Sequence, residues 1–194
     1  MKYFGGCDVG STYTKAVIMD ENGKVLAHTT IKSKINAALS AEAAMNEVVA
    51  QVPELKGDVK NLSYLVGTGY GRNKVATADE NISEISCHAM GVHITDPSVK
   101  AIIDIGGQDI KGIAIDTDGT VKNFAMNDKC AAGTGRFFEA MARSFELSLS
   151  DFSKLSLKAK NVIPISAQCT VFAESEVISL VGEGKPMDEI AAGI

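Results

Sequence analysis

The sequence lacks several features that mark well-known protein classes. No stretch of roughly 18 apolar residues occurs, so no candidate membrane-spanning helix is present. Basic residues do not outnumber acidic ones, and the net charge of -5 gives no electrostatic reason to expect nucleic acid or an anionic membrane as a partner. The N-terminal residues, MKYFGGCDVGS, contain no apolar signal segment and no cleavage site. We therefore expect a cytoplasmic protein with no membrane and no nucleic-acid partner.

Cysteine is also scarce, with four residues in 194: Cys7, Cys87, Cys130 and Cys169. Four are too few for a disulfide scaffold in a chain of this length, and the absence of a secretory signal favours reduced thiols. Each cysteine is then a candidate for metal binding or for plain burial. The hydrophobic residues, 45% of the total, are sufficient to bury the core of one large domain or of two small lobes.

An internal repeat is the most informative feature of the sequence. Residues 8–25, DVGSTYTKAVIMDENGKV, align without a gap to residues 104–121, DIGGQDIKGIAIDTDGTV. Each copy predicts a strand that ends in aspartate, a tight glycine turn, a return strand, and a second turn at Asn-Gly or Asp-Gly. The identities fall on residues with special backbone or charge roles: Asp8 and Asp104, Gly10 and Gly106, Lys15 and Lys111, Asp20 and Asp116, Gly23 and Gly119, Val25 and Val121.

The two glycine turns are candidate phosphate-binding loops. One copy alone is better explained as an ordinary hairpin, but the duplication favours two similar lobes that each bind phosphate through successive backbone N–H groups. Neither turn is a Walker A loop, because no Gly-Lys-Ser/Thr follows the glycines. The candidate nucleotide-binding residues are Gly10, Ser11, Thr12, Tyr13, Thr14 and Lys15 in the first turn, and Gly106, Gly107 and Gln108 in the second.

Asp8 and Asp104 need a different role, because carboxylates repel phosphate. We expect them to hold magnesium through its water shell or to orient an attacking water. Between the two copies, residues 37–52 and 82–94 have helical spacing, and residues 61–72 predict a short strand that runs into a glycine turn. Arg72, in that turn, either approaches a ligand or belongs to a simple strand-to-helix connection. We interpret Glu84 as a solvated helix residue in preference to a group that assists hydrolysis.

Cys130 and Cys169 occupy similar settings. Each precedes a segment with apolar residues at helical spacing, so each is expected at or just before a helix N-terminus. The positive end of the helix dipole and the free N–H groups stabilise a thiolate at such a position. With no His or Asp placed to activate a nucleophile, two matched cysteines favour a pair of metal ligands. Cys7 is expected within a strand and Cys87 within a helix, so neither is aimed at the same point.

The hairpin sequences resemble the phosphate loops of the actin, Hsp70 and sugar-kinase superfamily. The runs GTGYGRN, EISCHAMG, DIGGQD, MNDKCAAGTGRF and CTVFAESEVISL are similar to the ATPase activators (archerases) of 2-hydroxyacyl-CoA dehydratases, which are related to the ATPase subunits of benzoyl-CoA reductase. The resemblance runs from residue 4 to the last residue. It implies an α/β fold of duplicated ribonuclease-H-like lobes with mixed sheets, residues 1–98 and 99–194, that close over ATP and magnesium.

The resemblance also implies cofactors and partners. It implies ATP or ADP with Mg²⁺, and one [4Fe-4S] cluster per homodimer, bound by Cys130 and Cys169 of each copy. A reduced ferredoxin or flavodoxin supplies the electron, which passes at low potential to the dehydratase component. Asp8 and Asp104 are then the residues for magnesium and water, and Gln108 the residue for the γ-phosphate or the attacking water.

One departure and two alternatives accompany this interpretation. The family continues with a further glycine-glycine loop and a final helix, whereas this sequence ends at PMDEIAAGI, so we expect an incomplete second lobe. An ATP-dependent small-molecule or sugar kinase of the same superfamily is one alternative, and it requires magnesium but no iron. A cysteine-based redox or scaffold protein that uses nucleotide only as a structural ligand is the other.

Overall fold

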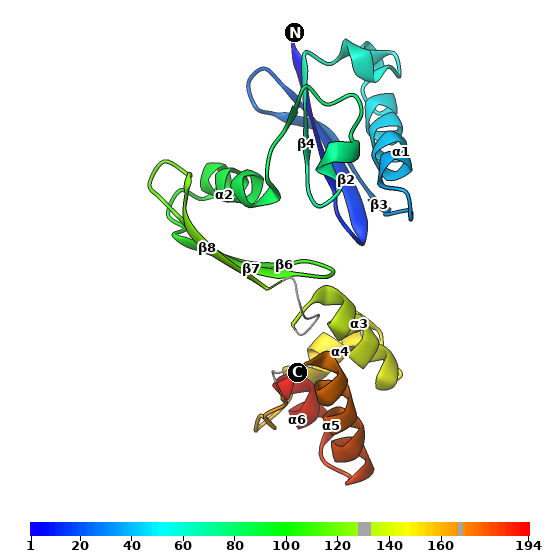
Figure 1. The fold of residues 1–194 in the computed structure, drawn as a ribbon, viewed down its shortest axis with the longest axis vertical. Coiled ribbons are helices and arrows are strands. Elements are labelled where there is room, and N and C mark those ends of the chain that lie inside the picture. Colours follow the sequence, from blue (N-terminus) through cyan, green and yellow to red (C-terminus); the bar gives the residue numbers. More distant parts are fainter. Residues whose placement is uncertain (128–132, 167–168) are drawn as a thin grey trace. The chain divides into compact units, whose positions relative to one another are not determined.

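The computed structural model describes residues 1–127, 133–166 and 169–194 (Figure 1). These residues form two compact units, one of residues 1–102 with 113–124 and the other of residues 103–112 with 125–194. The predicted division into lobes of residues 1–98 and 99–194 stays a prediction. In the described ranges, no helix is both long enough and apolar enough to cross a bilayer.

The first unit is built on a five-stranded sheet with the strand order β3-β2-β1-β4-β5. The neighbours of β2 run antiparallel to it, whereas β4 runs parallel to both β1 and β5. Burial alternates along β1 and β2, as expected for strands with one face on a core. The strands are β1 (Tyr3–Val9), β2 (Tyr13–Asp20), β3 (Val25–Lys32), β4 (Tyr64–Thr68) and β5 (Glu80–Asn81).

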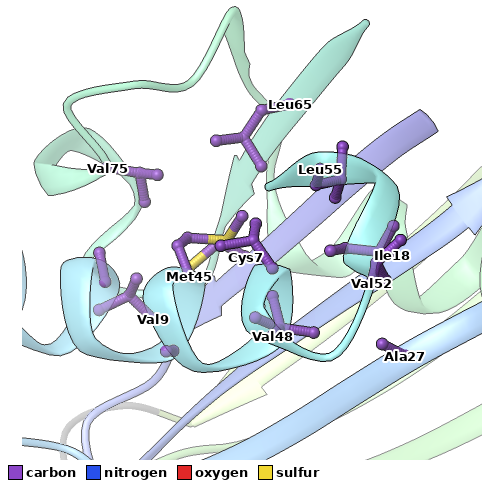
Figure 2. Packing of buried hydrophobic residues seen from close by; sticks show 14 residues of the cluster. Cys7, Val9, Ile18, Ala27, Met45, Val48, Val52, Leu55, Leu65 and Val75 are labelled. Atoms are coloured by element: carbon purple, nitrogen blue, oxygen red, sulfur yellow. The ribbon is translucent and has the colours of Figure 1, made fainter. Parts of the chain in front are cut away.

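Helix α1 (Ala37–Ala50) covers the core face of this sheet. The helix begins where Asn36 accepts hydrogen bonds from the N–H groups of Ala38 and Leu39, and residue 53 is the proline expected to end it. Figure 2 shows Cys7, Met45 and Val48 among the apolar side chains gathered between α1 and the strands. Short 3-10 turns connect α1 to β4 and β4 to β5: η1 (Pro53–Leu55), η2 (Val59–Asn61) and η3 (Arg72–Lys74).

Helix α2 (Glu84–Thr95) follows β5, close to the expected range of residues 82–94. Ser83 caps it by accepting a hydrogen bond from the N–H of Ile85. Ala89 of α2 is fully buried in a small core that it shares with Ile113 and Ile115. This core therefore joins α2 to the strand that contains those two isoleucines.

That strand belongs to a three-stranded sheet with the order β6-β7-β8. The strands are β6 (Ala101–Ile105), β7 (Ile110–Ile115) and β8 (Val121–Asn127), and residues of the sheet fall in both units. Its hairpins reproduce those of the first sheet, which confirms the structural repeat. The N–H of Gly10 donates to the carbonyl of Tyr13 over 3.1 Å, and the N–H of Gly106 donates to the carbonyl of Asp109 over 2.9 Å.

The rest of the second unit is helical. A core of Phe137, Met141, Phe152, Val177 and Ile190 joins its helices. The rings of Phe145 and Phe152 meet edge to face with centroids 5.2 Å apart, a favourable aromatic geometry. The helices are α3 (Gly135–Ser144), α4 (Leu149–Ser156), α5 (Thr170–Gly182) and α6 (Met187–Gly193).

Cys7 gives a testable pH dependence of stability. Burial, together with the negative charge of Asp8, raises the pKa of the Cys7 thiol from its ordinary value of 9.0 to about 12. The unfolded chain therefore releases this proton at a lower pH than the folded chain, and the stability linked to Cys7 falls as pH rises from 9.0 towards about 12. Between about pH 9 and about pH 10, the free energy of unfolding should fall by about 1 kcal/mol more in the parent than in Cys7→Ala.

Chemical denaturation at the two pH values measures this difference. Cys87→Ala is the matched control, because Cys87 lies on α2 and is only partly buried. The free energy of unfolding of this variant should change between the two pH values by the same amount as that of the parent. An equal change in the parent and in Cys7→Ala would contradict the prediction.

Candidate functional site

The first hairpin places Lys15 directly beside Asp8. The two residues are paired across β1 and β2, and Lys15 Nζ lies 3.0 Å from Asp8 Oδ2. The lysine side chain is 52% exposed, so a phosphate group can reach it without disturbing a buried contact. In the part of the chain that the structure describes, the second carboxylate oxygen, Asp8 Oδ1, has no hydrogen-bond donor. This oxygen is available to a hydrated cation.

The turn after Asp8 is braced by a residue that the sequence did not single out, Ser33. Its hydroxyl donates to the carbonyl of Gly10 over 2.7 Å, and its N–H donates to the carbonyl of Thr12 over 2.9 Å. Its hydroxyl also lies 2.9 Å from that of Thr14, which is fully buried. The Thr14 hydroxyl is therefore engaged inside the protein, while the Ser11 N–H and hydroxyl have no acceptor among the described residues.

Two residues of β4 and its turn complete the surroundings of Asp8. Thr68 is the register partner of Asp8 on the parallel strand, and its hydroxyl is buried without a hydrogen-bond partner in the described chain. Gly69 has a φ of +86°, and any Cβ at this position would overlap Asp8 Oδ1 and lie 2.8 Å from the carbonyl oxygen of Val9. An unpaired hydroxyl on the strand next to a carboxylate oxygen that has no donor in the described chain fits a site for hydrated magnesium with a phosphate group.

The second hairpin repeats the pair but encloses it. Lys111 Nζ lies 3.3 Å from Asp104 Oδ2 and 2.8 Å from Asp109 Oδ2, and its side chain is only 4% exposed. Burial by itself lowers the pKa of Lys111, but the hydrogen bonds and charges of Asp109 and Asp104 outweigh it, so the pKa is raised. Lys111 is thus held as a cation between two carboxylates, whereas its counterpart Lys15 is paired with one carboxylate among the described residues.

The second turn is bonded to the first turn of α3. The N–H of Gly135 donates to the carbonyl of Gly106 over 2.8 Å, and the N–H of Arg136 donates to the carbonyl of Gly107 over 3.2 Å. The N–H groups at the start of a helix lack acceptors within the helix, so these bonds satisfy two of them. The side chain of Gln108 is exposed and makes no hydrogen bond in the described ranges. Its amide is available to a ligand.

The cysteines divide as predicted where the structure describes them. Cys169 is the N-cap residue of α5, and its side chain makes no capping hydrogen bond. Cys7 is buried in β1 and Cys87 lies in α2. Cys130 lies outside the described residues. Within residues 1–127, 133–166 and 169–194, no three His, Cys, Asp or Glu side chains gather as a metal site. An uncapped thiol at a helix start nevertheless suits one ligand of a cluster.

The interpretation of Glu84 as a solvated residue is wrong. Its side chain is 16% exposed, and Glu84 Oε2 accepts a hydrogen bond from Arg72 Nη1 over 3.1 Å. Arg72 Nη1 also donates to the carbonyl of Gly69, again over 3.1 Å. Periodicity alone did not reveal this contact, because it joins a turn to a helix twelve residues later.

Comparison with known proteins identifies a family match for this chain. The family model described as "BadF/BadG/BcrA/BcrD ATPase family" matches residues 6–194. The chain belongs to the BadF/BadG/BcrA/BcrD ATPase family. Within this family, it is 45% identical over 192 residues to the activator of lactoyl-CoA dehydratase from Anaerotignum propionicum, an alignment that covers 99% of this chain and 73% of the relative.

Two solved structures of activators are similar along the whole chain. Component A of the Acidaminococcus fermentans (R)-2-hydroxyglutaryl-CoA dehydratase matches with a TM-score of 0.89 and 41% identity, covering 100% of this chain and 73% of that one. The activator of the 2-hydroxyisocaproyl-CoA dehydratase from Clostridium difficile, with bound ADPNP, matches with a TM-score of 0.86 and 41% identity, covering 98% and 70%. The predicted α/β fold of the actin, Hsp70 and sugar-kinase superfamily is confirmed.

The site of this BadF/BadG/BcrA/BcrD family member contains four residues that sequence reasoning missed: Ser33, Thr68, Asp109 and Lys111. Three of them carried a sequence signal: Lys111 aligns with Lys15 in the repeat, Asp109 ends the run DIGGQD, and Thr68 lies in the run GTGYGRN. Ser33 lies in none of these runs, and it braces the turn only because the end of β3 comes close to residues 10–14.

Proposed function

We propose that this chain is an ATP-hydrolysing iron-sulfur activator, which passes a low-potential electron to a 2-hydroxyacyl-CoA dehydratase or a related benzoyl-CoA-type reductase. The observation that carries the proposal is the 41–45% identity to dehydratase activators over at least 98% of the chain. The two Asp-turn-Lys hairpins and the uncapped Cys169 supply the chemistry that such an activity requires.

The hairpins bind the nucleotide in this proposal. Asp8 and Asp104 hold the water shell of Mg²⁺ or orient the attacking water, because each lies one residue before the end of its strand, beside a lysine that compensates its charge. Gln108 contacts the γ-phosphate or the attacking water. Phosphate oxygens are bound by Lys15, by the hydroxyls of Ser11 and Thr12, and by N–H groups of the two glycine turns such as those of Ser11 and Gly107. The N–H groups of Gly10 and Gly106 close the turns instead, because they donate to the carbonyls of Tyr13 and Asp109.

Cys130 and Cys169 from each of two copies supply four thiolates, the usual complement for a [4Fe-4S] cluster. When bound, such a cluster takes up and releases one electron at low potential. Cys169 presents its sulfur at the first turn of α5, where the helix dipole stabilises the negative charge of a thiolate. A reduced ferredoxin or flavodoxin is the proposed electron donor.

The second unit contains a direct connection between the second glycine turn and α3, the helix whose sequence follows Cys130. The carbonyls of Gly106 and Gly107 accept the first N–H groups of α3, the helix that follows the Cys130 segment. A shift of this turn on loss of the γ-phosphate would therefore move the first turn of α3. Hydrolysis is coupled to the cysteines through these two bonds.

An anaerobic activation assay tests the proposed function. The protein, a chemical reductant, Mg²⁺ and a 2-hydroxyacyl-CoA dehydratase are mixed, and dehydration is followed with ATP, ADP or ADPNP. We expect dehydration with ATP and less than about a tenth of that rate with either other nucleotide, because the electron moves only with hydrolysis. Equal rates with all three would overturn the proposal, as would the transfer of phosphate to a small hydroxylated substrate.

Gly135→Pro should uncouple hydrolysis from electron transfer. Gly135 is the first residue of α3, a position where proline is favoured, and Thr134 has the extended conformation that precedes proline. The substitution removes the N–H that donates to Gly106. The proline ring takes the place of the amide hydrogen, so the Gly106 carbonyl must also move away from the start of α3, while the helix itself can still begin at residue 135. We expect ATP hydrolysis within about threefold of the parent and activation of the dehydratase reduced about tenfold, a typical coupling energy.

Gly135→Ala is the control, because it retains the N–H. Its Cβ would lie 3.3 Å from the carbonyl oxygen of Gly106, a tight but tolerable contact. A parallel loss of both activities in Gly135→Pro, or full activation by it, would show that the bond does not carry the coupling.

A further inference from the structure

Arg72 connects two parts of the first unit that are distant in sequence. Its Nη1 donates to the carbonyl oxygen of Gly69 and to Glu84 Oε2, each over 3.1 Å. Both side chains are largely shielded from water, with 35% of Arg72 and 16% of Glu84 exposed. A charge-assisted hydrogen bond in such surroundings is stronger than one between neutral groups. The arginine therefore fixes the turn after β4 to the first turn of α2.

The turn that Arg72 fixes lies directly against the end of β1. The N–H of Gly71 donates to the carbonyl of Val9 over 2.8 Å, and Gly69 leaves no room for a side chain beside Asp8 Oδ1. Asp8 is thus bounded on one side by the Gly69 backbone and held on the other by Lys15. A displacement of the turn by a few tenths of an ångström would open space beside the Asp8 carboxylate.

We propose that Arg72, anchored by Glu84, is a positioning residue for Asp8, and that it acts through the backbone of the Gly69–Gly71 turn. Arg72 touches neither Asp8 nor any reacting atom in this role. The inference rests on the proposed function, in which Asp8 orders the water shell of Mg²⁺. It assigns to the Arg72–Glu84 pair a task beyond the joining of two segments, namely fixing the place of the magnesium-binding oxygen.

The geometry predicts a specific defect. Without Arg72 the Gly69 carbonyl loses its side-chain donor, the turn moves more freely, and Asp8 samples positions that do not suit the magnesium shell. Nucleotide binding without metal should change little, because the phosphate-binding turn of residues 10–13 is held independently by Ser33. The quantity to measure is therefore the ratio of the ADPNP dissociation constants without and with Mg²⁺.

Equilibrium binding of ADPNP to the whole chain provides this ratio. Arg72→Gln should lower it about tenfold and leave the dissociation constant without Mg²⁺ within about twofold of the parent, in the usual range of coupling between sites. Lys74→Gln is the matched control, since Lys74 is an exposed cation of the same short helix whose side chain has no hydrogen bond in the described chain; its backbone N–H donates to the carbonyl of Gly71 and is retained in the variant. Its ratio should equal that of the parent. Arg72→Lys should restore the ratio only in part, because a single ammonium does not reproduce the planar guanidinium.

Two further readouts do not depend on nucleotide. Hydrogen exchange of the Gly71 N–H should become about tenfold faster in Arg72→Gln and in Glu84→Gln, because the bond to Val9 opens more often. In the variant that carries both substitutions, the exchange of the Gly71 N–H should be no faster than in Arg72→Gln alone, as expected for residues that act as a unit. Thermal unfolding of each variant shows whether it is folded.

The outcomes separate the inference from the proposed function. A parent whose ADPNP affinity does not respond to Mg²⁺ would overturn the role of Asp8 in the proposed function, and this inference with it. A magnesium response in the parent that Arg72→Gln leaves unchanged would overturn the inference alone, even if the variant unfolds at a lower temperature. Unchanged exchange at Gly71 would also overturn it.

Discussion

Cys169→Ala should lose essentially all iron from protein purified without oxygen, whereas the parent should contain about two irons and two acid-labile sulfides per chain, the share of one [4Fe-4S] cluster between two copies. Activation of the dehydratase should fall to background. The physical reason is the ligand count: each copy contributes Cys130 and Cys169, so each substitution removes two of the four thiolates from the dimer.

The remaining cysteines provide the control for this result. Cys87→Ala should retain the parent's iron, because Cys87 lies in α2 of the first unit and not at a helix start of the second. Cys130→Ala should lose its iron as Cys169→Ala does.

Solution mass measured on the same samples should show a dimer in the parent. The binding of ADPNP should survive in both iron-free variants, since none of the hairpin residues is altered.

Two results would contradict the shared cluster. Full iron content in Cys169→Ala would exclude this residue as a ligand. The absence of iron from a folded parent would remove the cluster from the proposal altogether and direct attention to phosphoryl transfer, which needs magnesium but no iron.

Asp8→Asn should lower the turnover of ATP at least about 100-fold, the usual effect of removing one well-placed electrostatic group from an active site. Asparagine is nearly the same size as aspartate and still accepts a hydrogen bond from Lys15, so the hairpin should remain intact. It lacks the negative charge that holds the water shell of magnesium. The rate of phosphate release under saturating ATP and Mg²⁺ measures the effect.

Glu21→Gln is a suitable control, because it removes the same charge from the loop between β2 and β3, away from the turn of residues 10–13. It should retain the parent's turnover. Thermal unfolding of both variants separates loss of chemistry from loss of fold. Turnover of Asp8→Asn within about threefold of the parent would exclude Asp8 as the residue that holds magnesium or water.

The sequence by itself determined the repeated hairpins and most of the helices. The alternation of apolar and polar residues in strands, the Asn-Gly and Asp-Gly turns, and the helical spacing of apolar residues are properties of residues close together in the chain. They can therefore be recognised without knowledge of the fold. The start of α5 at Cys169 and the end of α1 before Pro53 followed from the same local rules. The resemblance to the activators depends on short continuous runs as well, and the comparisons confirm it.

Tertiary structure decided what surrounds Asp8 and its turn. Thr68 is the register partner of Asp8 because β4 pairs with β1, Ser33 braces the turn of residues 10–13 from the end of β3, and Arg72 pairs with Glu84 across the β4–α2 connection. Strand register and loop path set these contacts, and neither is encoded in the spacing of neighbouring residues. The same holds for the difference between the two lysines of the repeat. Identical in sequence position, Lys15 is half exposed beside one carboxylate, whereas Lys111 is buried between two, because only the second turn carries an aspartate that faces the lysine.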